Sequence, residues 1–362
     1  MRNNFAVLPF TPNFANGFAL YNVTASPTPV ACKVRVVRPS HSGIRTAVRL
    51  SATLIFPLFS KTDIPRKEAT VMEYTINVGG RLLSLARPVV MGILNLTPDS
   101  FFSGSRMLSE STYTDSDAER IRQRARQILD EGGTIIDVGA CSTRPGSDEV
   151  STDEEMHRLA AGLEVIRREA PDAIISVDTF RADVARMCVR DFGVQIINDI
   201  AGGEMDRAMF HTIGRLGVPY ILMHMQGKPR DMQTSPHYDN VTADVMAYLA
   251  RRAQMLRDNG VNDIIADPGF GFGKTLEHNY DMLQHLECFH ELGMPLLVGV
   301  SRKSMIYRML GGTPAEALNG TTAIHVISLL KGAHILRVHD VREAVEAVRI
   351  VDACQHPESL RV

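Results

Sequence analysis

Polar or charged side chains follow eight short apolar runs, at the point where each run ends. In chain order they are Asn95, Thr143 with Arg144, Asp178, Asn198, His224, Asp267, Ser301 with Arg302 and Lys303, and Arg337 with His339. Any one of them could have a structural role, since an Asp after a strand is a common helix N-cap. Capping does not explain eight such positions in a row, so we interpret them as one functional site.

Some of these residues have the chemistry of an anion site. Asn95, Arg144, Arg337 and His339 are neutral or cationic, and the planar guanidinium of arginine matches phosphate oxygens. We therefore expect them to bind a polyanion such as a diphosphate. Mg²⁺ is the cofactor expected beside it, because this ion keeps several waters and few protein ligands.

The residues Asp178, Asn198, Asp267 and Lys303 suit a different ligand. A carboxylate can accept two parallel hydrogen bonds from the N–H and NH₂ groups of a pterin or guanine ring, and a lysine can donate to the ring carbonyl. The site is thus expected to hold a planar heterocycle deep inside and an anionic tail near its mouth.

The glycine-rich stretch DPGFGFGKT, residues 267–275, does not match a nucleotide-binding loop. A phosphate-binding P-loop would need glycine where Pro268 stands, and Gly269, Gly271 and Gly273 follow a G-x-G-x-G spacing instead of G-x-G-x-x-G. We expect these glycines to provide tight turns. Lys274 is expected to lie on the surface at the beginning of a helix.

The eight apolar runs are rich in Val and Ile and nearly continuous, which is typical of parallel strands covered on both faces. They span residues 89–95, 134–140, 174–179, 196–200, 220–225, 264–269, 295–301 and 334–340. Amphipathic patterns at 117–133, 153–171, 181–193, 241–260 and 340–354 indicate helices between them. The pattern predicts an α/β fold, a single (β/α)₈ TIM barrel, with a doubly wound open sheet as the weaker alternative. Its active site would lie at the carboxyl ends of the strands, and residues 75–85 would form a short N-terminal β-hairpin.

Composition excludes several classes of protein. The 362 residues carry a formal net charge of −2, and 44% are hydrophobic. No apolar run reaches the roughly 18 residues of a membrane span. The five cysteines are scattered and form no C-x-x-C pair, which favours reduced thiols in a cytoplasmic protein. Residues 72–362 are acidic overall, so we expect neither a nucleic acid nor a membrane partner.

Residues 1–71 differ from the rest of the chain. They contain nine Lys or Arg and only two acids, Asp63 and Glu68, together with seven prolines. Three interpretations remain open: an organellar transit peptide, a disordered tail, or a mis-assigned segment before a true start at Met72. We therefore expect a disordered or mis-assigned extension at 1–71 and a catalytic barrel at 72–362.

The motifs that end the runs resemble those of the dihydropteroate synthases of bacterial folate synthesis, a family of pterin-binding barrels. The resemblance covers roughly residues 73–353 and rests on motifs in the same order and at compatible spacings. They are NLTPDSF (95–101), STRPG (142–146), SVDT (176–179), IINDI (196–200), LMHMQG (222–227), DPGFGFGK (267–274), VGVSRKSM (298–305) and RVHDV (337–341).

The resemblance implies a reaction in which p-aminobenzoate displaces diphosphate from (7,8-dihydropterin-6-yl)methyl diphosphate by an SN1-like path. It also implies which residues bind each part. The pterin would contact Asp178, Asn198, Met223, Asp267 and Lys303. The diphosphate would contact Asn95, Thr143, Arg337 and His339, with Asn95 also binding Mg²⁺. The p-aminobenzoate, which sulfonamides mimic, would contact Phe101, Thr143, Arg144, Pro145, Gly271, Phe272 and Ser304.

Two loops depart from the family pattern. The first contains SFFSGSRM where an Asp and paired glycines usually follow the Phe, and the second has Ala140-Cys141 where Gly-Glu is common. Both bear on the aminobenzoate contacts. The alternative functions are a pterin-binding methyltransferase and a pterin-binding module that has lost catalysis. The family further implies a homodimer formed through late helices.

Overall fold

The computed structural model describes residues 73–97, 115–141, 150–227 and 232–360, together with the backbone of two short strands near the N-terminus. The chain divides into two compact units, Met1–Thr70 and Val71–Val362. In the first unit, β1 (Arg35–Val36) pairs with β2 (Val48–Arg49) in an antiparallel ladder. The second unit contains the site residues.

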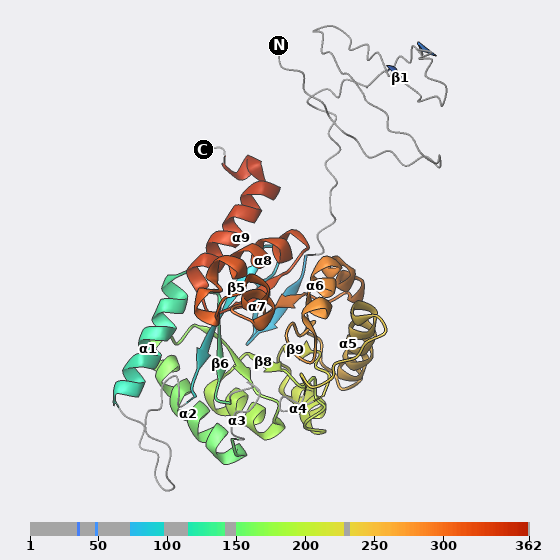
Figure 1. Cartoon of the computed structure of the whole chain (residues 1–362). Coiled ribbons are helices and arrows are strands. Elements are labelled where there is room, and N and C mark those ends of the chain that lie inside the picture. Colours follow the sequence, from blue (N-terminus) through green and yellow to red (C-terminus); the bar gives the residue numbers. More distant parts are fainter. Residues whose placement is uncertain are drawn as a thin grey trace. The chain divides into compact units, whose positions relative to one another are not determined.

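The second unit is a parallel barrel, seen in Figure 1 as strands surrounded by helices. Its strands are β5 (Val89–Asn95), β6 (Ile135–Gly139), β7 (Ile174–Asp178), β8 (Ile196–Asp199), β9 (Tyr220–Met223), β10 (Ile264–Asp267), β11 (Leu297–Val298) and β12 (Ile335–Val338). They pair in the order β10-β9-β8-β7-β6-β5-β12-β11. A parallel bridge between Ala266 and Leu296 joins the two ends of this order. The eight predicted strands and the barrel are confirmed, and the open sheet is excluded.

Helices connect the strands and cover the barrel. They are α1 (Asp115–Asp130), α2 (Thr152–Glu169), α3 (Ala182–Phe192), α4 (Met209–Leu216), α5 (Val241–Asp258), α6 (Leu276–Gln284), α7 (Ser304–Leu310), α8 (Leu318–Leu330) and α9 (Val341–Gln355). The described residues also form three 3₁₀ helices: η1 (Leu286–Leu292), η2 (Pro314–Glu316) and η3 (Pro357–Leu360). No helix in the described part of the chain has the length and apolar character to cross a membrane.

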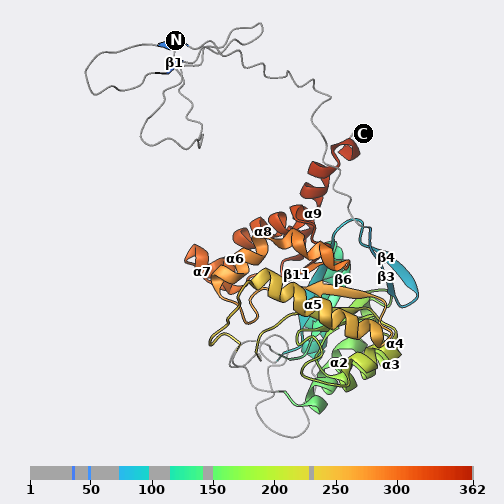
Figure 2. The ribbon, with the colours of Figure 1, turned by 90° about the vertical axis from the view of Figure 1, so that its right-hand side faces the viewer.

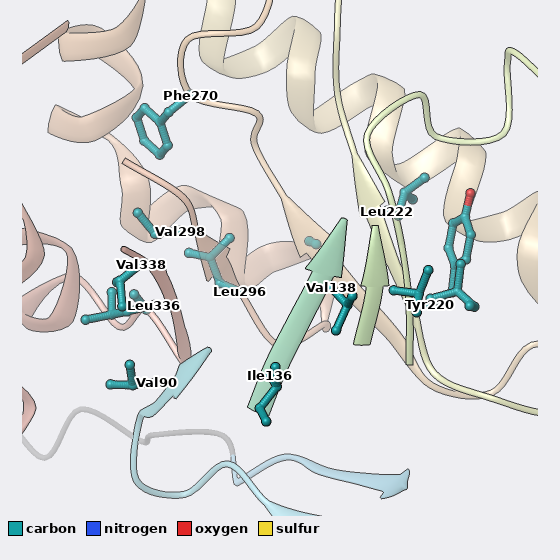
Figure 3. Close-up of a cluster of buried hydrophobic side chains, with 14 of the residues drawn as sticks. Val90, Ile136, Val138, Tyr220, Leu222, Phe270, Leu296, Val298, Leu336 and Val338 are labelled. Carbon is teal, nitrogen blue, oxygen red and sulfur yellow. The ribbon is translucent and has the colours of Figure 1, made fainter. Parts of the chain in front are cut away.

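Side chains on the outer face of the strands form the main core against the helices. Figure 3 shows this packing, with Val90 of β5, Ile136 and Val138 of β6, and Leu336 and Val338 of β12 among the labelled residues. Because successive residues of a strand point to opposite faces, the alternate positions face the inside of the barrel. The inner positions are therefore available to the site.

The bottom of the barrel is closed by an antiparallel hairpin, β3 (Thr75–Val78) and β4 (Arg81–Ser84), as the sequence predicts. Figure 2 shows this hairpin at one end of the barrel. Its buried side chains Ile76 and Val78, with Leu85 just after β4, pack on inward residues near the beginning of most strands. These residues are Met91, Ile135, Ile196, Ile221, Ile265, Leu297 and Ile335. The lower barrel is thus a dry apolar layer beneath the polar residues.

Two N-terminal deletions distinguish the contribution of residues 1–71 to stability from that of this hairpin. A chain starting at Met72 is expected to keep the thermal unfolding midpoint of the full-length protein. A chain starting at Pro88 also loses Ile76, Val78 and Leu85, each worth about 1.5–3 kcal/mol of burial, and is expected to unfold at a clearly lower temperature. Differential scanning calorimetry of the three chains checks both statements, and equal midpoints for the two deletions would contradict the role of the hairpin.

Candidate active site

The polar residues of the strands meet inside the barrel. Arg337 of β12 donates from Nε to Asp137 of β6 at 2.6 Å and from Nη2 to Asp178 of β7 at 2.8 Å. Asn198 of β8 donates to the same Asp137 carboxylate at 3.2 Å. Because β12 is separated from β6 by β5 and from β7 by two strands, these side chains can reach one another only through the interior.

Burial gives this network its electrostatic character. The carboxylate of Asp137 is fully buried and the side chain of Arg337 is only 19% exposed. Burial raises the pKa of Asp178 above its ordinary value, and the Arg337 guanidinium opposes that rise. The side chain of Asp178 is 16% exposed, so a ligand that offers N–H groups to it would replace its remaining contact with solvent by fixed partners.

The second part of the network surrounds Gly299, just after β11. A side chain added to Gly299 would lie 3.9 Å from Lys303 Nζ and 4.0 Å from Asp267 Oδ2. The missing side chain therefore leaves the space between these two groups open. Burial lowers the pKa of Lys303 to about 8, opposed by the nearby charge of Asp267. The Lys303 ammonium also donates to the carbonyl of Phe270 and lies 4.5 Å from the ring centre of Phe272.

The glycine-rich loop that follows β10 holds Asp267 in place. Gly269 and Gly273 adopt φ values of +70° and +58°, a region that favours glycine. A side chain on Gly269 would also collide with the carbonyl oxygen of His224 at 1.9 Å. The amide of Gly269 donates to Asp267 Oδ1 at 2.7 Å, which leaves Oδ2 directed toward Lys303. The expectation that these glycines provide turn geometry is confirmed.

An apolar wall lines the same end of the barrel. Met223 is buried in a cluster with Ile200, Met225 and Met232, against which Phe180 and Phe272 pack. Methionine and aromatic side chains are polarisable and pack well against a flat ring. The predicted position of Met223 beside a planar ligand fits this wall.

Three of the predicted anion residues, Asn95, Arg337 and His339, lie at the ends of β5 and β12. A side chain on Gly139 would lie 3.6 Å from Asn95 Oδ1 and 3.6 Å from Asp178 Cβ, so the space between Asn95 and Asp178 is also open. His339 is half-buried, and burial followed by the charge of Arg337 lowers its pKa to about 4. Without an anion, His339 is thus neutral at pH 7.

One residue assigned to the anion, Arg337, makes its main contacts with two carboxylates of the barrel interior. Arg337 does not stand apart as a free diphosphate ligand, because its guanidinium binds Asp137 and Asp178. It therefore joins the two predicted groups of residues into one network. A ligand that forms hydrogen bonds with Asp178 would release Nη2 of Arg337, while Nε would keep its hydrogen bond to Asp137.

The site predicted for aminobenzoate is described only in part. Gly271 and Phe272 lie on the loop after β10, and Ser304 is the first residue of α7, directly after Lys303. The remaining assignments lie outside the described residues: Phe101, Thr143, Arg144 and Pro145.

Two expectations about neighbouring residues are wrong. Lys274 is 3% exposed and therefore buried instead of lying on the surface, because its ammonium contacts three backbone carbonyls and His224. His224 itself does not face the interior. It is buried on the helix side of β9, with its ring edge-on to Tyr248 of α5 at 4.8 Å.

Arg302 also has a structural role. Its φ of 53° makes it the one non-glycine residue with positive φ in the described ranges. Two 2.8 Å hydrogen bonds to Asp340 and further bonds to the carbonyls of Pro314 and Ala315 hold the side chain away from the interior. Contacts of this kind offset the 1–3 kcal/mol or so that such a backbone conformation costs.

The sequence analysis missed Asp137, which the structure places at the centre of the network. A signal was present, since Asp137 is the one charged residue in an otherwise apolar run. Asp137 lies in the middle of β6, whereas the predicted site residues lie at or after the ends of the strands.

The described residues offer little protein coordination to a metal ion. Among them, no group of three or more His, Cys, Asp or Glu side chains could hold one. Asn95 presents an amide oxygen beside open space, and Mg²⁺ accepts oxygen ligands while retaining several waters and substrate phosphates. The residues therefore fit a Mg²⁺ ion held mainly by its substrate, and do not form a cage for a resident metal.

Comparison with known proteins identifies relatives of the whole barrel. A family model described as "Pterin binding enzyme" matches residues 91–339. The dihydropteroate synthase of Escherichia coli K12 is 44% identical over 276 residues, which cover 76% of this chain and 94% of that protein.

Two solved structures of dihydropteroate synthases are also similar to this chain. The dihydropteroate synthase of Yersinia pestis in a sulfonamide drug complex is 40% identical, with a TM-score of 0.70 over 78% of this chain and 99% of that one. The dihydropteroate synthase of Thermus thermophilus in complex with 4-aminobenzoate is 37% identical, with a TM-score of 0.67 over 77% of this chain and 99% of that one.

Proposed function

Since the chain belongs to the pterin-binding enzyme family, we propose that it condenses (7,8-dihydropterin-6-yl)methyl diphosphate with p-aminobenzoate. The products are 7,8-dihydropteroate and diphosphate, so the protein is a transferase of folate synthesis. One observation carries the proposal: Asp178, Asn198, Asp267 and Lys303 converge inside the barrel beside the apolar wall around Met223. These are the groups that a pterin edge and a flat ring require.

Asp178, Asp267 and Lys303 bind different groups along the edge of the pterin ring. Asp267 Oδ2 and the Asp178 carboxylate accept from ring N–H and NH₂ groups, while Lys303 donates to the ring carbonyl. Asn198 is fixed by its hydrogen bond to Asp137, so its amide oxygen is turned toward the ligand. Charge-assisted hydrogen bonds of this kind contribute about 1.5–3 kcal/mol each, which favours a pterin over an apolar ring of the same shape.

The diphosphate is assigned to the mouth of the barrel. Asn95, Thr143, Arg337 and His339 are the proposed contacts, and the open space beside Asn95 supports its part. An anion close to His339 favours the protonated imidazole, so diphosphate binding raises the low pKa of that residue. Mg²⁺, bound with Asn95, supplies further positive charge to the diphosphate.

Bond making and breaking then need no nucleophilic side chain. The bond between the exocyclic methylene carbon and the diphosphate oxygen breaks, and its electron pair leaves with the diphosphate. The electron-rich dihydropterin delocalises the resulting positive charge, while Arg337 and His339 stabilise the departing anion. The amine of p-aminobenzoate attacks the methylene carbon and releases one proton after the C–N bond forms.

The aminobenzoate is proposed to lie against Gly271 and Phe272, with its carboxylate near Ser304 and its other contacts from Phe101, Thr143, Arg144 and Pro145. The ring of Phe272 packs at the border of the apolar wall and over the ammonium of Lys303. An aromatic ring placed there is adjacent to both the pterin site and the start of α7. Backbone N–H groups at a helix start favour an anion.

A steady-state assay tests the proposed function directly. The purified protein is incubated with dihydropterin diphosphate, p-aminobenzoate and Mg²⁺, and 7,8-dihydropteroate is separated by chromatography. Formation of the product is expected, and its formation should stop when Mg²⁺ is chelated. Binding of the pterin without any product would instead favour the inactive module, while methyl transfer from a methylated folate would favour the methyltransferase.

We also propose that the enzyme is a cytoplasmic homodimer. Exposed apolar side chains on α7 and α8 support a contact between subunits, and they include Met309, Leu310, Ile327 and Leu330. The described cysteines are free thiols, which supports a reducing compartment. Sedimentation of the purified protein as a monomer at micromolar concentration would contradict the dimer.

Sulfonamide binding is expected to depend on the other ligands. Much of the aminobenzoate pocket is assigned to residues 96–106 and 140–150, largely outside the described ranges, and their Gly, Ser and Thr content motivates the prediction. Ordering such segments costs on the order of 1 kcal/mol per residue, a cost that bound diphosphate would offset first. Calorimetric titration of a sulfonamide should give little heat alone and a clear isotherm once pterin, diphosphate and Mg²⁺ are present. Equal affinity in both conditions would show a preformed pocket.

A further inference from the structure

Lys274 is a buried cation that donates to carbonyls of the loop that carries Asp267 and also contacts His224 outside that loop. Its Nζ donates to the carbonyl of Gly269 at 2.9 Å and to that of Phe272 at 3.0 Å. The third close contact is with Nδ1 of His224 at 3.0 Å. A lysine ammonium has three protons and no lone pair, so Nδ1 accepts and the imidazole carries its proton on Nε2.

Several other polar groups of the loop bind partners outside it, whereas the amide of Phe272 donates to the carbonyl of Gly269 at 3.1 Å within the loop. Gly271 donates to Asn279 Oδ1 at 2.7 Å and accepts from the amide of Gln233. The carbonyl of Gly273 accepts from the Tyr238 hydroxyl at 2.7 Å. Lys274 differs from Asn279, Gln233 and Tyr238 because its side chain joins the beginning of the turn to its end. Without that ammonium, the carbonyl of Phe272 would lose this donor, and the carbonyl of Gly269 would keep the amide of Phe272 as a donor.

Lys274 is also linked to the carboxylate that is proposed to bind the pterin, because it donates to the carbonyl of Gly269, whose amide donates to Asp267. Burial raises the pKa of Asp267, and the opposing influences are Lys303, the Gly269 amide, Arg337 and Lys274. Conversely, burial lowers the pKa of Lys274 to about 7. Asp267 opposes that change, and the charge of Lys303 adds to it. The remaining ionisable groups around the ammonium stay neutral: burial lowers the pKa of His224 to about 2, and burial raises those of Tyr238 and Tyr248.

We propose that Lys274 is a positioning residue for the pterin substrate. Its ammonium binds Gly269, Phe272 and His224, which fixes the loop at 267–273 and adds a positive charge, besides that of Lys303, that favours the ionised form of Asp267. Asp267 is thereby kept ionised and aimed at the ring edge, and Phe272 is kept at the border of the aminobenzoate site. This inference rests on the function proposed above and extends it to a residue that touches neither substrate.

The test compares Lys274→Met with Lys331→Met, a matched change outside the loop. Lys331 also makes two hydrogen bonds, to the Gln284 carbonyl at 2.7 Å and to Glu287 at 2.6 Å. Losing the loop contacts of Lys274 is expected to raise the KM for dihydropterin diphosphate at least about tenfold. Lys331→Met should leave that KM within about twofold, since an exposed pair contributes little.

The pH dependence of pterin binding distinguishes positioning from a general loss of stability. Asp267 must be ionised to accept from the ring, and removing a nearby cation raises its pKa. The pH below which pterin binding fails is therefore expected to move upward in Lys274→Met and to stay unchanged in Lys331→Met. Lys274→Gln keeps two N–H donors without the charge, so it should show the same pH shift with a smaller rise in KM.

Each outcome bears on the proposal. Wild-type KM values and an unchanged pH profile in Lys274→Met and Lys274→Gln would overturn it. If Lys274→Met does not fold, Lys274→Gln alone decides, and failure of both to fold would show a purely structural residue and also overturn it. A wild-type protein that neither binds the pterin nor forms dihydropteroate would refute the proposed function instead, so the two failures are distinguishable.

Discussion

Asp267→Asn is expected to lower kcat/KM for dihydropterin diphosphate by at least about 100-fold. The new side chain would keep Oδ1 on the amide of Gly269, as Asp267 does at 2.7 Å. Its NH₂ group would then face the ring, where the pterin also presents donors. Two hydrogen bonds to a charged acceptor contribute about 3–6 kcal/mol in total, and each 1.36 kcal/mol is a factor of about ten.

Asp263→Asn is the matched control for this variant. Asp263 immediately precedes β10 at the opposite end of the barrel, where its carboxylate accepts from the backbone amide of Asn77 at 2.9 Å. We expect this control to retain kcat/KM within about threefold, since one exposed hydrogen bond contributes about 1 kcal/mol or less. Circular dichroism and thermal unfolding should show both variants folded. Near wild-type turnover by Asp267→Asn would remove Asp267 from the pterin site.

Arg337→Met is expected to have the largest effect on stability. It leaves the fully buried carboxylate of Asp137 and the 16% exposed carboxylate of Asp178 without their shared cation. Removing one partner of a buried ion pair costs about 3–5 kcal/mol. Urea titration followed by fluorescence or circular dichroism measures the loss. Arg186→Met removes an ion pair with Asp183 that is 39% and 67% exposed, and should cost no more than about 1 kcal/mol.

The loss in Arg337→Met is expected to depend on pH. Arg337 opposes the upward pKa shift that burial gives Asp178, so without it that pKa rises further. A carboxyl group with a raised pKa in the folded state contributes stability at low pH and loses it as pH rises through the folded value. The difference in unfolding free energy between wild type and variant should therefore be smaller at pH 5 than at pH 8. An equal difference at both pH values would contradict the buried network.

The sequence predicted the strands well because each lies in a short, nearly continuous apolar run, and most of these runs are rich in Val and Ile. Some helices were harder to recognise. Along α8, Ile324 and Leu329 are buried, but Ile327 and Leu330 are exposed, so apolar residues occur on all sides and no clear periodicity appears. The strand predicted at 295–301 is only two residues long, β11 (Leu297–Val298), because the chain turns away toward Lys303 beyond that point.

The sequence predicted which residues form the site, but it did not predict which of them contact one another. Residue type and position at strand ends identified Asp178, Asn198, Asp267 and Lys303. The partners of Arg337 depend on which strands face each other across the barrel, and no local pattern encodes that. The burial of Lys274 is likewise hidden, since its acceptors are backbone carbonyls whose directions are set by the turns at Gly269 and Gly273.

The pairing of Arg337 with Asp137 joins residues 200 positions apart. During synthesis, β6 leaves the ribosome long before β12, so a partly made chain has a carboxylate facing the future interior with no cation to meet it. Closing that region early would bury an unpaired charge, which is strongly unfavourable. This cost disfavours collapse of the incomplete barrel into a compact non-native state. Long-range contacts of this kind also slow folding, so we expect the final closure, when β12 inserts between β5 and β11, to be the slow and cooperative step.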